Sequence, residues 1–349
     1  MKELLVLKTG ALGDVLRTTS ILPGLHERYS RSRITWVTAP AALDLVRLHP
    51  LVSQVVPFDP GSPAELEEVG ARLSLVTWER ILSLDDEELC CRLASRLPTK
   101  RLSGAWFDET ARACRYTADV AAWFDMGLLS VHGKLVADRL KLENTRSQPE
   151  IYAEMLGIRM GKPELALDPG SELEADEARR SLGLDFQRPV IGLNTGAGGR
   201  WTSKALPVER TVSLALGLHE GLAGEVTFLL LGGPDEAARN REIAARLSDR
   251  VRLVDTGTDN SLLRFAALVS LCDLLVVSDS LALHVAVALD VRVVAFFAPT
   301  SAAEIELYGL GEKVVSTAPD AGSYRPDADT ATLTVERLRD AVLRQLQPR

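Results

Sequence analysis

The sequence predicts an α/β protein that consists of two doubly wound halves, each with its own core. The first observation is the length, since 349 residues correspond to two domains of ordinary size. The second is the alternation of short apolar runs with helical segments, which is typical of βαβ units and a mostly parallel sheet. The third is the composition: 46% of residues are hydrophobic and only 5% are aromatic. That balance favours packed α/β layers over an all-β sandwich.

In the first half, short apolar runs predict buried strands and the longer stretches between them predict helices. The predicted strands are Leu4–Leu7, Ile34–Val37, Gln54–Pro57 and Arg80–Leu84. The predicted helices are Asp14–Tyr29, Ala41–Leu48, Ala64–Leu73, a helix that ends near Arg96, Leu135–Leu142 and Glu150–Leu156. The stretch 104–135 shows no clean period, because aromatic residues interrupt it.

A second α/β series follows the turn-forming residues at Gly161–Ser171, which predict a linker. Its predicted strands are Val190–Leu193, Val226–Leu231, Val251–Val254, Asp273–Val277 and Val291–Phe297. Its predicted helices are Ser171–Ser181, 207–220, 235–247, Ser261–Ser270, 281–289 and Thr334–Leu346. We therefore expect one domain over residues 1–165 and a second over 166–330. We expect the helix within 331–349 to pack back toward the N-terminal domain.

Charge and cysteine content exclude several classes of protein. The net charge is −8, so no broad basic surface for DNA or RNA is indicated. Four Cys without a CxxC pair indicate neither a disulfide framework nor a zinc site. No apolar run is long enough for a signal peptide or a membrane span. We expect a cytoplasmic protein, a monomer or weak dimer, with peripheral contact at the cytoplasmic face of the inner membrane left open.

The segment Lys8-Thr9-Gly10-Ala11-Leu12-Gly13-Asp14-Val15 follows the first predicted strand. Gly10 and Gly13 allow a ligand to approach the backbone closely, and free N–H groups at a helix start favour an anion or a hydroxyl group. Asp14 can act as a general base if it reaches the proton of an acceptor. The alternative is that Asp14 only caps its helix. The segment is neither a G-x-G-x-x-G fingerprint nor a P-loop.

Two further loops combine polar residues with the ends of predicted strands. Asn194–Lys204 contains Thr195, Gly196 and two cations, Arg200 and Lys204, which suit phosphate oxygens. In Val276–His284, the backbone N–H groups after Ser280 could hold a diphosphate, with Asp279 and His284 nearby. The alternatives are a solvated surface loop for the first, and a capped helix with a core histidine for the second.

Three acidic stretches are weaker candidates. Glu236 follows a strand and could bind ribose hydroxyls, although helix capping is the simpler explanation. Asp85-Asp86-Glu87-Glu88 stands at the start of a predicted helix, where acidic residues complement the dipole. Asp327-Ala328-Asp329 lies in a late loop and follows no strand. We therefore expect no metal site and no cofactor besides a co-substrate.

Taken in order, Lys8–Leu16 with Thr18-Thr19, Arg200–Lys204, Asp279-Ser280 with His284, and Pro299-Thr300-Ser301 resemble glycosyltransferase family 9, the heptosyltransferase family. The resemblance implies a GT-B fold, in which two Rossmann-like domains face each other across a cleft. It also implies inverting, metal-independent sugar transfer from a nucleotide diphosphate donor such as ADP-heptose to a cell-surface glycan or lipopolysaccharide-type acceptor.

The resemblance also assigns roles to residues. Asp14 matches the general base, and Lys8, Thr9, Gly10 and Gly13 stand on the acceptor side. The donor side comprises Thr195, Gly196, Arg200, Lys204, Glu236, Asp279, Ser280, Leu281 and His284. Leu281 departs from the family, which commonly has Gly there, and would be strained if that position needs a positive φ.

Two rival functions stay open at this stage. A sugar-nucleotide epimerase with the GT-B fold would form product from the donor alone. A protein that binds nucleotide sugars without turnover is the other, and Leu281 is the reason to consider it.

Overall fold

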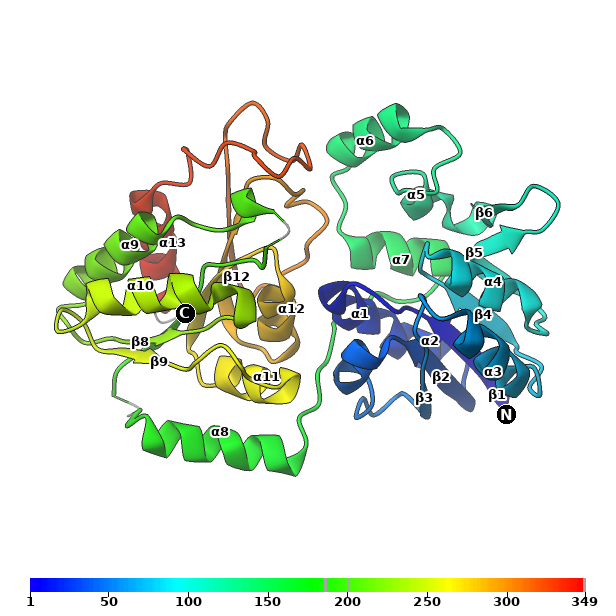
Figure 1. The fold of residues 1–349 in the computed structure, drawn as a ribbon, viewed down its shortest axis with the longest axis horizontal. Helices are drawn as coiled ribbons and strands as arrows, with labels where there is room; N and C mark the ends of the chain where they lie inside the picture. Colours follow the sequence, from blue (N-terminus) through cyan, green and yellow to red (C-terminus); the bar gives the residue numbers. More distant parts are fainter. Residues whose placement is uncertain (185–186, 200, 348–349) are drawn as a thin grey trace. The chain divides into compact units, whose positions relative to one another are not determined.

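The computed structural model describes residues 1–184, 187–199 and 201–347. The chain divides into two compact units, Met1–Ala166 and Leu167–Arg349. Each unit contains one six-stranded sheet with helices on its faces (Figure 1). In the described ranges, none of the helices combines the length and hydropathy needed to cross a membrane.

The first unit contains a mostly parallel sheet with the strand order β3-β2-β1-β4-β5-β6. Its strands are β1 (Lys2–Leu7), β2 (Ser32–Thr38), β3 (Gln54–Pro57), β4 (Arg80–Ser83), β5 (Leu102–Asp108) and β6 (Ala113–Tyr116). The central strands are apolar and buried, as parallel strands covered on both faces must be. β6 pairs antiparallel with β5, and this hairpin lies in the stretch 104–135, where the sequence showed no clean period.

The helices of the first unit begin and end at recognisable sequence signals. They are α1 (Leu12–Thr18), η1 (Thr19–Ile21), α2 (Leu22–Arg28), η2 (Pro40–Leu45), α3 (Pro63–Leu73), α4 (Glu88–Arg96), η3 (Ala118–Val120), α5 (Ala121–Phe124), α6 (Lys134–Glu143) and α7 (Gln148–Leu156). α7 begins with a capping box between Ser147 and Glu150 and ends at Gly157, whose φ of 64° suits a left-handed C-cap.

The predicted helix Asp14–Tyr29 is wrong in detail, because it is split into α1, η1 and α2. The Thr18 hydroxyl donates to the Asp14 carbonyl at 2.6 Å, and the Thr19 hydroxyl donates to the Leu16 carbonyl at 2.7 Å. Such local bonds compete with the helical ladder and bend it. Pro23, in the first turn of α2, has no N–H to continue the ladder.

The second unit repeats the strand order of the first, in the sequence β12-β11-β10-β7-β8-β9. Its strands are β7 (Val190–Asn194), β8 (Thr227–Leu230), β9 (Leu253–Asp255), β10 (Leu274–Ser278), β11 (Arg292–Phe297) and β12 (Gly311–Val315), all parallel. Counted within each unit, the strands follow the order 3-2-1-4-5-6, which is that of a Rossmann-like sheet. β12 was not predicted from the sequence.

The helices of the second unit are α8 (Pro169–Ser181), η4 (Thr202–Lys204), α9 (Val208–Gly221), η5 (Pro234–Glu236), α10 (Ala237–Leu247), α11 (Leu262–Ser270), α12 (Leu281–Ala288) and α13 (Val335–Leu346). The expected packing of α13 toward the N-terminal domain is not what the structure shows. α13 lies beside α9, and its buried Leu338, Ala341 and Val342 belong to the core of the second unit (Figure 1). Its amphipathic face completes the nearest apolar layer, which is the sheet it follows in the chain.

Candidate active site

In a Rossmann-like sheet, ligands bind at the carboxyl ends of the strands, where the strand order reverses. In the first unit this point lies between β1 and β4, and in the second between β7 and β10. The loops that leave these four strands carry most of the residues that the sequence selects. Each unit is described by itself.

In the first unit, one buried carboxylate organises the loop between β1 and α1. Asp85, in the loop after β4, accepts hydrogen bonds from Thr9 N–H at 2.5 Å, from the Thr9 hydroxyl at 2.6 Å and from Gly10 N–H at 3.3 Å. It also pairs with the Lys8 ammonium at 3.0 Å. The predicted dipole role of Asp85 is therefore incomplete, because α4 begins only at Glu88 and Asp85 binds the neighbouring loop.

Lys8 is a buried cation whose charge is matched by acidic neighbours. Burial lowers the pKa of its ammonium, but the negative charges of Asp85 and Asp14 outweigh burial, so the pKa lies above its ordinary value. Burial, followed by the charge of Asp85, raises the pKa of the adjacent Asp86. The loop thus contains a compact set of coupled charges.

Asp14 lies in the first turn of α1 and is not its cap. The N-cap position is Ala11, which makes no side-chain cap bond. The Asp14 carboxylate pairs with Arg17 at 2.8 Å, and its side chain is 38% exposed. The Arg17 guanidinium lies 5.7 Å from the centre of the Trp123 ring. Asp14 is therefore accessible to a ligand while its negative charge is stabilised.

Helix α7 forms another border of this site. Gln148 donates to the Thr18 hydroxyl at 3.3 Å, which links α7 to the end of α1. The Tyr152 ring contacts Trp123 edge to face, with ring centres 5.3 Å apart. Burial raises the pKa of Tyr152 to about 12, so the phenol stays protonated at neutral pH.

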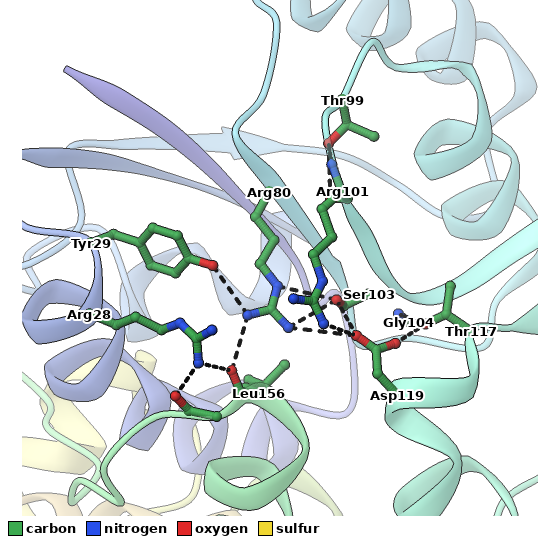
Figure 2. Close-up of polar contacts among 11 residues, drawn as sticks. Arg28, Tyr29, Arg80, Thr99, Arg101, Ser103, Gly104, Thr117, Asp119 and Leu156 are labelled. Atoms are coloured by element: carbon green, nitrogen blue, oxygen red, sulfur yellow. Dashed lines mark hydrogen bonds and ion pairs between the residues drawn. The ribbon is translucent and has the colours of Figure 1, made fainter.

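A buried arginine network holds the far end of α7 (Figure 2). Arg80, at the start of β4, donates to the Leu156 carbonyl at 3.1 Å and to the Ser103 hydroxyl at 2.9 Å. Arg28 donates to the same Leu156 carbonyl at 3.1 Å. Ser103 in turn donates to Asp119 at 2.7 Å. Since the last carbonyls of a helix lack partners within it, the two arginines anchor α7 through its C-terminus.

In the second unit, Lys204 and Asp279 form the corresponding pair. The Lys204 ammonium donates to the Asp279 carboxylate at 3.0 Å and to its backbone carbonyl at 2.9 Å. The His284 imidazole lies 4.0 Å from the same carboxylate. Burial raises the pKa of Asp279, but the charges of Lys204 and His284 outweigh burial and keep the pKa below its ordinary value. Three predicted donor-side residues therefore meet at one point.

The N-terminus of α12 adjoins this pair. Its N-cap is Ser280, which makes no side-chain cap bond, and the hydroxyl has no hydrogen-bond partner among the described residues. Neither Ser278 nor Asp279 occupies the cap position that the sequence offered as an alternative. Leu281 is the first helical residue and is not among the residues with a positive φ, so the expected strain at this position is absent.

Two side chains that follow β8 fix the long loop after β7. Glu236 accepts from Gly198 N–H at 2.6 Å and from Gly233 N–H at 2.8 Å, and a Cβ on Gly196 would lie 2.4 Å from its Cγ. Arg239 donates to the Thr195 hydroxyl at 2.9 Å. Arg200, the other predicted cation, lies outside the described residues.

Sequence reasoning did not select Arg80, Tyr152 or Arg239, and it gave Asp85 a different role. Arg80 had a detectable signal, because a charged residue that opens an apolar strand needs a partner. Asp85 follows a buried strand directly, as does Asp279, which was selected. Tyr152 and Arg239 lie in ordinary helical patterns and carry no such signal. Among the described residues, no group of three or more His, Cys, Asp or Glu side chains is arranged to hold a metal ion.

Comparison with known proteins places these observations in a family. The model of glycosyltransferase family 9 (heptosyltransferase) matches residues 102–326. No curated protein matches the chain in sequence.

Solved structures resemble the whole chain at low sequence identity. A family 9 glycosyl transferase from Veillonella parvula DSM 2008 is 20% identical, with a TM-score of 0.81 over 99% of this chain and 97% of that one. The E. coli ADP-heptose lps heptosyltransferase II is 18% identical, with a TM-score of 0.67 over 99% and 98%. E. coli heptosyltransferase WaaC with ADP is 16% identical, with a TM-score of 0.60 over 98% and 97%.

These likenesses confirm the predicted GT-B fold, and the family model covers well over half of the chain. The protein therefore belongs to glycosyltransferase family 9, the heptosyltransferase family, and is a glycosyltransferase.

Proposed function

We propose that the protein is an inverting glycosyltransferase that transfers a heptose-like sugar from an ADP-type donor to a lipopolysaccharide-type glycan. The observation that carries the donor assignment is the Lys204–Asp279 pair beside the uncapped N-terminus of α12. A fixed ammonium and free backbone N–H groups suit a diphosphate. The ADP and ADP-heptose named for the similar structures support the choice of nucleotide.

The reaction is a direct displacement at the anomeric carbon of the donor sugar. An acceptor hydroxyl oxygen forms the new bond to that carbon, and the bond from the carbon to the diphosphate oxygen breaks. The hydroxyl proton passes to the Asp14 carboxylate, which acts as general base. The electron pair leaves with the nucleoside diphosphate, whose charge Lys204, Arg200 and the α12 N–H groups stabilise without a metal ion.

Further residues support the binding of the two substrates. Thr195 and Gly196 border the donor, and Glu236 holds their loop through Gly198, with ribose contact left to its remaining lone pairs. His284 keeps Asp279 ionised beside Lys204. On the acceptor side, Gly13 lies in α1 one residue before Asp14. The helical backbone of Leu281 removes the reason for preferring a protein without turnover.

The test of the base assignment is the variant Asp14→Asn, assayed as ADP release from ADP-heptose with truncated lipopolysaccharide as acceptor. Loss of a general base lowers kcat about 100- to 10,000-fold, whereas the Kd for ADP stays the same. Asp44→Asn is the matched control, because Asp44 also pairs with an arginine three residues later, at 2.6 Å. Unchanged turnover in the Asp14 variant would refute the assignment.

A thermal-shift series identifies the donor independently of the acceptor. ADP-, GDP-, UDP- and dTDP-sugars are compared at equal concentration, since a ligand of the folded state raises the apparent Tm. ADP-heptose should give the largest rise. A larger rise with another nucleotide would change the donor, and product formed from the donor alone would favour an epimerase.

A further inference from the structure

The loop that precedes Asp14 directs its hydrogen-bond donors inward, away from any ligand. Four donors of Lys8, Thr9 and Gly10 end on the Asp85 carboxylate, at distances between 2.5 and 3.3 Å. The side chains of Lys8 and Asp85 are 9% and 6% exposed. A group so enclosed has little surface left for an acceptor sugar.

The charges around Lys8 come from every element packed against it. Asp85 and Asp86 face it from the loop after β4, Cys90 from α4, Asp14 from α1 and Tyr152 from α7. Asp85 is the carboxylate in direct contact with the ammonium. Asp14, the next carboxylate in influence on Lys8, pairs with Arg17 at 2.8 Å. The contact with Asp85 therefore keeps two opposite charges, those of Lys8 and Asp14, in separate pairs.

We propose that Asp85 is a positioning residue that holds Lys8 away from Asp14 and fixes the start of α1, so that Asp14 faces the acceptor hydroxyl as a competent base. This inference rests on the proposed role of Asp14. It moves Lys8, Thr9 and Gly10 from direct acceptor binding to support of the base. Asp85 acts through these three residues and touches neither substrate.

The central experiment is the pH profile of ADP release for Asp85→Asn, with ADP-heptose and truncated lipopolysaccharide as substrates. Asparagine has the same shape but no charge, so the Lys8 ammonium turns to Asp14 and stabilises its ionised form. The acid limb of kcat then moves to lower pH. The maximal kcat falls about 100-fold, because a small misplacement of a reacting group has an effect of that size. The KM for the donor stays the same.

Two variants separate the charge from the shape of the loop. Lys8→Met combined with Asp85→Asn removes both charges, and its acid limb should return to the wild-type pH. Thr9→Val removes one of the four donors and leaves the ion pair, so kcat falls a few-fold with an unmoved limb. Glu87→Gln, an exposed acidic residue two positions later, is the control and should keep both kcat and the limb.

An unmoved acid limb in Asp85→Asn, or a limb that stays displaced in the double variant, would overturn the proposal. If Asp85→Asn does not fold, the double variant still tests it, because neutral groups often replace a buried ion pair without loss of folding. In that case, wild-type kcat in the double variant supports a charge-separating role, and a 100-fold loss contradicts it.

Chemical labelling tests the clamp without any sugar transfer. Acetylation followed by mass spectrometry should leave Lys8 unmodified in the wild type and modify it in Asp85→Asn, while Lys134, 84% exposed, reacts in both. If wild-type protein releases no ADP but Lys8 shows this pattern, the proposed function fails and the clamp stands. If Lys8 reacts as readily as Lys134 in the wild type, the clamp itself is refuted.

Discussion

The two units have the same strand order and the same type of ion pair at the same point of the sheet, but they bury it differently. Lys8 follows β1 and pairs with Asp85 after β4, whereas Lys204 lies in the loop after β7 and pairs with Asp279 after β10. The side chains of the first pair are 9% and 6% exposed, and those of the second 22% and 16%. The first pair therefore stabilises a loop, and the second is open enough to meet a ligand.

The difference follows from the length of the loop between strand and helix. Only four residues separate β1 from α1, so the donors of that loop lie against the neighbouring strand end and one carboxylate satisfies them. The loop from β7 to α9 is longer, and Glu236 and Arg239 hold it from outside. Lys204 is therefore not needed to hold that loop. A shared fold thus supports a closed loop in one unit and an anion site in the other.

The largest expected effect concerns Arg80, which belongs to the first unit alone. Arg80→Met leaves the Leu156 carbonyl, Ser103 and Asp119 without their buried partner. We expect a loss of about 3 kcal/mol in the unfolding free energy, as for other broken buried charge networks. Urea unfolding measures it, and ADP affinity should be unchanged. A loss below that of the exposed control Arg325→Met would mean that α7 does not depend on this network.

The next effect separates the two lysines. Lys204→Met should weaken ADP binding by about 1.5–3 kcal/mol, the usual contribution of a charge-assisted hydrogen bond. Lys8→Met should leave the Kd for ADP unchanged, because Lys8 is enclosed by Asp85. Isothermal titration with ADP measures both variants. Equal losses would remove the distinction between a structural pair and a binding pair.

The smallest effect is a difference in pH dependence between the pairs. The pKa of Lys8 is raised in the folded state, so its contribution to stability is complete below its ordinary pKa of 10.5 and is lost as the pH rises through the folded value. The pKa of Asp279 is lowered, so its contribution is present above 3.8 and is lost as the pH falls through the folded value.

Thermal unfolding across pH tests this difference with one variant for each pair. Lys8→Met should flatten the alkaline arm of the Tm profile, and Asp279→Asn the acid arm. The reverse assignment, or no change in either arm, would contradict the raised pKa of Lys8 and the lowered pKa of Asp279. Asp44→Asn serves as the control, because its pair with Arg47 lies at the surface.

Much of the fold was predictable, because buried parallel strands are short apolar runs that need no partner to be recognised. The strands from β1 to β4 and the central strands of the second unit were located in this way. The hairpin β5–β6 was not, since its polar edge strand Ala113–Tyr116 has no apolar run. The split near Thr18 was also missed, because hydroxyl bonds to the backbone leave no periodic signal.

The sequence by itself determined the α/β class, the family and the chemical type of the loops at the strand ends. These properties depend on local composition and on the order of motifs along the chain. Only the tertiary structure decided that Asp85 binds Lys8, Thr9 and Gly10, that Asp279 pairs with Lys204, and that α13 completes the second core. Such contacts join residues that are up to 77 positions apart in the first two cases, and packing selects their partners. A local pattern can show that a buried charge needs a partner, but it cannot show which residue the fold brings to it.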